Sequence, residues 1–180
     1  KYNKKIICSF IASDRPGLIE MLADTISLSN GSWLESRSTK LAGQFAGIVR
    51  IEVSEDDKEQ LIRALMHLNK RNVMVQISDS QLTHDYYTGL DTQDNALQLT
   101  VLGNDRPGII LHISQALASA NINVVDMETF ITSAAMSGDS LFNAKLTLCD
   151  KNTYDIATLE KQLNSIALRL TLEIDLDTEN

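Results

Sequence analysis

The tetrapeptide Asp-Arg-Pro-Gly occurs twice in this sequence, at residues 14–17 and again at residues 105–108. Each copy follows an apolar run and precedes a stretch in which apolar residues recur at helical spacing. The two copies lie 91 residues apart in a chain of 180 residues. A repeat with this period predicts two copies of one small module in tandem rather than a single large domain.

The first repeat has the pattern βαββαβ. A helix is predicted after the first turn, ending near the Asn30-Gly31 pair, which is a typical stop signal. Ser54, with Asp57 three positions later, predicts the capped start of a second helix. Apolar runs and alternating patterns predict strands at residues 6–12, 33–40, 45–53 and 73–77.

The second repeat follows the same order. Its first helix carries apolar residues at the positions that match the first repeat, because Leu18, Leu22 and Ile26 correspond to Ile109, Ile113 and Leu117. The loop at 134–139 is longer than its counterpart by about six residues. Strands are predicted at residues 97–102, 122–131, 142–148 and 168–176.

Two βαββαβ units predict an α+β protein with two ferredoxin-like domains. Each domain should have an antiparallel four-stranded sheet with both helices on one face. The predicted boundaries are residues 1–80 for the first domain and 96–180 for the second. The polar segment 81–95 is predicted to be a linker.

The charge balance and the cysteines narrow the class of protein. The chain has 16 basic and 24 acidic residues, and its net charge of −8 disfavours direct binding to nucleic acid. Cys8 and Cys149 lack CxxC spacing and a histidine at metal-ligand spacing, which predicts free thiols, with neither a metal nor another cofactor. The longest apolar run is too short to cross a bilayer. The expected location is therefore the cytoplasm.

Residue patterns typical of catalysis do not occur in the sequence. The three histidines, His67, His84 and His112, have no nucleophile paired with them by spacing. The motifs GxSxG, GxGxxG, HExxH and the P-loop do not occur either. We therefore predict a protein that is not an enzyme.

The repeated turn is the best candidate for a binding site. A glycine between a strand and a helix lets a ligand approach the backbone, and the free N–H groups of the helix can receive a carboxylate. The aspartate could accept from an ammonium group or cap the helix, and the arginine could pair with a carboxylate. A zwitterion such as an amino acid would satisfy both needs. The alternative is that the Pro-Gly pair only forms a good turn.

The order βαββαβ with Asp-Arg-Pro-Gly after the first strand resembles the ACT domain, a regulatory module that often binds amino acids. Similar turns occur in the ACT domains of formyltetrahydrofolate deformylase. Two further segments are more specific, Trp-Leu-Glu-Ser-Arg at 33–37 and Leu-Ala-Gly-Gln-Phe-Ala-Gly at 41–47. With them, the chain resembles the family of glycine cleavage system transcriptional repressors over essentially its whole length.

This resemblance implies a repressor that binds a LysR-type activator rather than DNA, and that responds to an amino acid, with glycine as the expected ligand. It also implies ligand sites where two ACT domains meet, each formed by the first turn and the start of the second strand. In the first repeat these positions are Asp14, Arg15, Pro16, Gly17, Leu18, Asn30, Trp33 and Leu34. In the second repeat they are Asp105, Arg106, Pro107, Gly108, Ile109 and Asn121.

Equivalent binding in both repeats is not expected, because Ile122-Asn123 replaces Gly31-Ser32 at the start of the second strand. Trp33 is expected to pack in the core or an interface, near the turn. Two other functions stay open, a regulatory subunit of an amino-acid metabolic enzyme and a purely structural dimerisation module. Exposed strand edges favour a homodimer or pairing of the two domains within one chain.

Overall fold

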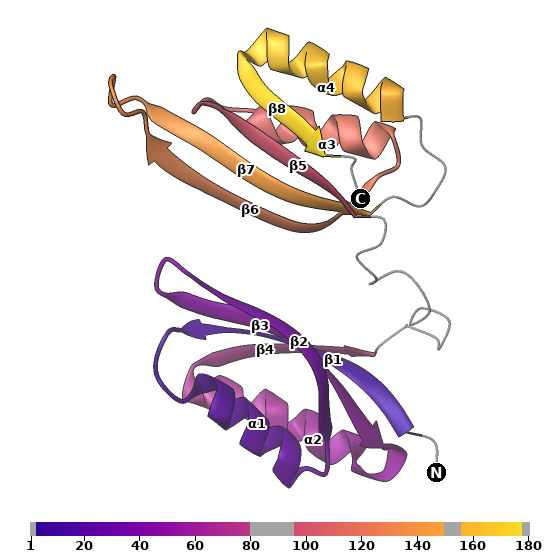
Figure 1. The fold of residues 1–180 in the computed structure, drawn as a ribbon. Helices are drawn as coiled ribbons and strands as arrows, with labels where there is room; N and C mark the ends of the chain where they lie inside the picture. Colours follow the sequence, from indigo (N-terminus) through magenta and orange to yellow (C-terminus); the bar gives the residue numbers. More distant parts are fainter. Residues whose placement is uncertain (1–2, 80–95, 150–155, 178–180) are drawn as a thin grey trace. The chain divides into compact units, whose positions relative to one another are not determined.

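The computed structural model describes residues 3–79, 96–149 and 156–177. The chain divides into two compact units, Lys1–Thr83 and His84–Asn180. Figure 1 shows that each unit has its own sheet and its own pair of helices. The predicted linker, residues 81–95, lies outside the described residues, so its boundaries stay a prediction.

The first unit has the predicted order of elements, and its second, third, first and fourth strands lie side by side in this order in an antiparallel sheet. Both helices cover one face of this sheet (Figure 1). A short 3-10 helix, which the sequence pattern did not predict, follows the second helix. The elements are β1 (Asn3–Ser13), α1 (Leu18–Leu28), β2 (Ser32–Leu41), β3 (Gln44–Ser54), α2 (Glu55–His67), η1 (Leu68–Arg71) and β4 (Val73–Asp79).

The second unit repeats this topology with the strand order β6-β7-β5-β8. Its elements are β5 (Ala96–Asn104), α3 (Ile109–Ser119), β6 (Asn123–Ser133), β7 (Ser140–Cys149), α4 (Ile156–Leu170) and β8 (Leu172–Asp177). The prediction of two ferredoxin-like α+β domains is therefore confirmed. The longer loop predicted at 134–139 is the connection between β6 and β7.

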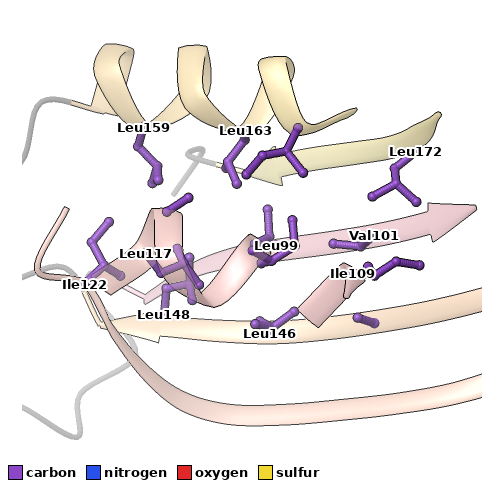
Figure 2. Packing of buried hydrophobic residues seen from close by; sticks show 14 of the residues in the cluster. Leu99, Val101, Ile109, Leu117, Ile122, Leu146, Leu148, Leu159, Leu163 and Leu172 are labelled. Atoms are coloured by element: carbon purple, nitrogen blue, oxygen red, sulfur yellow. The ribbon is translucent and has the colours of Figure 1, made fainter. Parts of the chain in front are cut away.

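Each domain has a separate hydrophobic core between its sheet and its helices. In the first domain, alternate residues of β1 are buried against both helices, among them Ile6, Cys8 and Phe10. In the second domain, Figure 2 shows the equivalent packing. Leu99 and Leu146 from the sheet belong to one buried cluster together with side chains from α3 and α4. The predicted apolar faces of the helices therefore point toward the sheets.

The last predicted strand, residues 168–176, was placed too early. The helix α4 continues to Leu170, and β8 begins only at Leu172. Thr171, with a φ of 54°, makes the reversal between them. The apolar residues of this segment fit both a helix and a strand, so their spacing did not locate the change.

Among the described residues, the structure contains no helix that is long and apolar enough to cross a membrane.

Candidate ligand-binding site

The two Asp-Arg-Pro-Gly turns share one backbone conformation. Gly17 and Gly108 have φ values of 87° and 90°, and each is the N-cap of the helix that follows. This left-handed conformation favours glycine, because other residues pay for it with steric strain. Pro16 could have begun the helix, since proline suits the first helical turn, but it does not. The left-handed glycine delays the helix until Leu18, so the proline lies before the cap.

Neither of these helices has a side-chain cap. In α1 the first backbone hydrogen bond runs from Met21 N–H to the carbonyl of Gly17, at 2.9 Å. In α3 it runs from His112 N–H to the carbonyl of Gly108, at 3.0 Å. The N–H groups that precede these donors therefore have no acceptor within their helix. The side chains of Asp14 and Asp105 therefore do not cap the helices that follow them, although the sequence had left this role open.

The start of α2 shows the contrast. There the hydroxyl of Ser54 accepts from the N–H of Asp57 at 3.1 Å and donates to the Asp57 carboxylate at 2.7 Å, which confirms the predicted cap. The helices after the glycine turns lack such a side chain, and their first N–H groups carry the positive end of the helix dipole. The turns are therefore suited to receive an anion.

In the first turn, the charged side chains are held by contacts within the domain. The carboxylate of Asp14 lies 2.7 Å from Nζ of Lys40, and this hydrogen bond and negative charge raise the pKa of Lys40. A guanidinium N–H of Arg15 donates to the carbonyl of Arg71 at 2.7 Å. An ammonium group that binds Asp14 would share its carboxylate with Lys40.

The second turn differs at the side chains although its backbone matches. Asp105 N–H donates to the carbonyl of Ser140 at 2.9 Å, as Asp14 N–H does to Gly43. Ile131, opposite Phe142 in the sheet, takes the place of Lys40, which is opposite Phe45. Within the described part of the chain, the side chains of Asp105 and Arg106 form no hydrogen bond or ion pair with other groups.

His112 and Arg169 flank the second turn, and neither was predicted to belong to the site. A Cβ on Gly108 would lie 3.7 Å from the His112 ring, whereas one on Gly17 would meet no atom within 4 Å. Arg169 Nη2 lies 3.3 Å from Nδ1 of His112. The sequence indicated this difference only through His112, which stands where the first repeat has Met21.

Leu18 and Ile109 were predicted to contact a ligand, but their side chains belong to the cores, with 5% and 2% exposure. They anchor the first turns of α1 and α3 against the sheets. Only their backbone N–H groups remain for a ligand at these positions. Pro16 and Pro107 are both exposed beside them.

The residues predicted at the start of the second strand lie at the other end of the helix. The 11 residues of α1 separate Asn30 and Trp33 from the first turn, by about 16 Å at 1.5 Å per residue. The expectation that Trp33 lies near the turn was therefore wrong. The turn adjoins Lys40, close to the end of β2, because the strand runs back along the helix before it reaches the turn.

These residues have local roles in the structure. Asn30, with a φ of 58°, ends the first helix, and its amide donates to Asp57 at 3.3 Å. Trp33 is half-buried against the core, and its expected packing is confirmed. Leu34 lies at a β-bulge and is 40% exposed. Asn121 follows the same pattern after α3, with a φ of 56°. One domain alone thus does not bring the two predicted halves of a site together.

The described residues contain no cluster of three or more histidine, cysteine, aspartate or glutamate side chains able to hold a metal. Their chemistry is that of backbone donors beside a few charged side chains. Such an arrangement suits reversible binding of a small anion or zwitterion.

The fold and its repeated turn define the chain as a tandem pair of ferredoxin-like βαββαβ domains. The sequence pattern of the ACT domain matches residues 4–78 and again residues 97–167. The chain therefore belongs to the ACT domain family, whose domains are regulatory, and it contains two of them in succession.

Several relatives are similar to single parts of the chain. A UPF0237 protein of Methanocaldococcus jannaschii is 33% identical over 84 residues, which cover 46% of this chain and 86% of that protein. A UPF0237 protein of Methanosarcina mazei is 28% identical over 82 residues, or 46% of this chain and 84% of that protein. Each relative thus matches about one domain of this protein.

Two solved structures resemble the whole chain. A protein of unknown function from Galdieria sulphuraria has a TM-score of 0.78 at 20% identity, over 99% of this chain and 100% of that one. A proposed glycine cleavage system transcriptional repressor has a TM-score of 0.72 at 13% identity, over 98% of both chains. At these identities the likeness shows that the tandem fold is shared.

Proposed function

We propose that this protein is a non-enzymatic regulator that senses a small amino acid, with glycine as the expected ligand, and represses transcription by binding a LysR-type activator. The observation that supports sensing is the pair of uncapped helix starts behind Gly17 and Gly108. Their backbone N–H donors suit the carboxylate of an amino acid. The glycine at each cap has no side chain, which leaves room for a ligand as small as glycine.

The ammonium group of the ligand needs an acceptor. In the second turn, the carboxylate of Asp105 forms no hydrogen bond or ion pair with other described residues, so it is available to this group. In the first turn, the charge of Asp14 is already partly neutralised by Lys40, 2.7 Å away. We therefore propose that the second turn binds the ligand more tightly than the first, although its strand start departs further from the family pattern.

The resemblance to ACT domains implies that a complete site takes groups from a second ACT domain. The turn and the start of the second strand lie about 16 Å apart within a domain, which exceeds the length of an amino acid. A domain of the same chain or of another chain can supply the missing strand start. Binding would then stabilise one pairing of domains, and this is how a small ligand can change the affinity for a protein partner.

The proposed role in repression rests on the family resemblance, together with two further observations. The structure shares its tandem fold with the proposed glycine cleavage system transcriptional repressor. The net charge of −8 disfavours direct contact with DNA, which fits action through a DNA-bound protein.

Calorimetric titration of the full chain with glycine, alanine and serine tests the sensing function. Acetate and methylamine serve as controls, because each carries only one of the two charged groups of glycine. We expect glycine to bind and each half-ligand to bind at least about tenfold more weakly. A failure of all amino acids to bind at millimolar concentration would refute the sensing function.

Affinity capture with a LysR-type activator, with and without glycine, tests the repression. We expect the activator to be retained without glycine and released with it. Retention of an amino-acid metabolic enzyme, with altered kinetics and no retained activator, would instead establish the regulatory subunit.

A further inference from the structure

Each sheet has one face covered by its helices and one open face. The strand register places Ile7, Ile11, Ile48 and Met74 together on the open face of the first domain, which we call the first open face. Ile11 lies directly opposite Met74, and Ile48 lies opposite Ser9, between Ile7 and Ile11. Three of these apolar side chains are well exposed, Ile11 at 40%, Ile48 at 53% and Met74 at 69%.

The second domain shows that the fold does not need apolar residues at these places. In the same register, Gln98, Leu102, Lys145 and Glu173 stand where the first domain has Ile7, Ile11, Ile48 and Met74. The open face of the second domain is therefore polar at three of the four positions. Exposed apolar residues that the fold does not require are typical of an interaction surface.

The charges on the two open faces point to the partner. The open face of the second domain carries five carboxylates around Lys145, contributed by Asp126, Glu128, Glu173, Asp175 and Asp177. Two copies of such a face would repel each other. The first open face is nearly balanced, since Lys5, Arg37 and Arg50 accompany Glu35 and Glu52. Arg50 and Glu35 already form an ion pair at 2.7 Å.

We propose that the first open face is the surface through which two copies of this protein associate, sheet against sheet, about a twofold axis. Such an axis brings the apolar residues of one copy onto the same residues of its partner, and the balanced charges allow this contact. Four strands of about seven residues span roughly 19 Å by 23 Å. Because this area is at the low end for specific complexes, we expect a dissociation constant in the micromolar range.

The second domain supplies variants that fit the fold. Ile48→Lys and Met74→Glu each introduce the residue that the second domain carries at the matching position. The control variant Leu102→Lys makes an equivalent change on the open face of the second domain. Circular dichroism and thermal unfolding of each variant establish that it is folded.

Sedimentation velocity of the full chain without amino acids, from about 1 to 200 μM, measures the association directly. We expect a monomer–dimer equilibrium for the wild type and for Leu102→Lys. Ile48→Lys and Met74→Glu should each raise the dissociation constant by about 100-fold or more, because the twofold axis places each new charge in the interface twice. A wild type that stays monomeric throughout this range would overturn the proposal.

Other results would overturn the proposal in favour of a different occupant or surface. If both variants associate as tightly as the wild type, or if Leu102→Lys weakens association equally, the dimer uses another surface. If the wild type is monomeric and Ile48→Lys abolishes capture of the transcription activator, the first open face binds that partner instead. None of these outcomes depends on whether an amino acid binds at the turns.

Discussion

A single methyl group added at Gly17 separates the role of the turn in folding from its role in binding. Gly17 has a φ of 87°, so the variant Gly17→Ala must hold an alanine in the left-handed region. This strain costs about 1 to 2 kcal/mol. A Cβ at this position meets no atom within 4 Å, so no clash adds to the cost. The variant should fold, with a thermal midpoint lowered by about 4–8 °C for each kcal/mol.

The same open space is where a carboxylate would approach the first N–H groups of α1. If the backbone of the first turn binds glycine, the added methyl group keeps the ligand away from these donors. We then expect the affinity for glycine at this site to fall at least about tenfold. Gly108→Ala makes the same test at the second turn, where its Cβ would be in ordinary contact with His112 at 3.7 Å.

Gly138→Ala is the matched control. Gly138 also has a positive φ, 71°, and a Cβ there also meets no atom within 4 Å, but it belongs to the loop between β6 and β7. It should lose similar stability and keep the wild-type affinity for glycine. Calorimetric scanning and ligand titration of the three variants give both quantities. Unchanged affinity in Gly17→Ala and Gly108→Ala would refute the proposal that backbone donors bind the ligand.

Three further predictions concern stability. Ser54→Ala removes the cap of α2 and should cost about 1 kcal/mol in chemical denaturation, and an unchanged midpoint would contradict the cap. Gly47→Ala places a Cβ 2.7 Å from the carbonyl of Arg37 and should destabilise by about 1 to 3 kcal/mol, and an unchanged free energy of unfolding would contradict this close packing. Burial raises the pKa of the Cys8 thiol from 9.0 to about 11, so its contribution to stability should be complete below pH 9 and lost as the pH rises toward 11. Cys8→Ala should lack this part of the pH dependence in unfolding titrations, and an identical profile would show that the thiol is not its source.

The duplication, the fold and the capped start of α2 could all be predicted from the sequence. They depend on local spacing, such as that of Leu18, Leu22 and Ile26, and the second copy checked each assignment made on the first. The early placement of β8 has the same origin, because the apolar residues around Leu170 fit the spacing of either element. Only the competition between helix and strand in the folded domain decides where the helix ends.

The turn could be predicted as a feature, but its surroundings could not. Lys40 is 26 residues from Asp14, and Arg169 is 57 residues from His112, so their contacts depend on how the chain folds back across the sheet. The misplacement of Trp33 has a simple geometric cause. A strand that follows a helix begins at the far end of that helix, and this separates Trp33 from a turn that is only 16 residues earlier.

The two repeats therefore share a backbone and differ in what their side chains leave available. At the first turn, Lys40 pairs with the carboxylate of Asp14, while Ile131 stands at the matching position of the second domain and forms no such ion pair with Asp105. The open faces differ as well, because three of the four positions that form the apolar cluster of the first domain are polar in the second, where five carboxylates surround Lys145 and Phe130. Since neither difference is required by the fold, the two proposals together imply a division of roles, with ligand binding strongest in the second domain and self-association in the first.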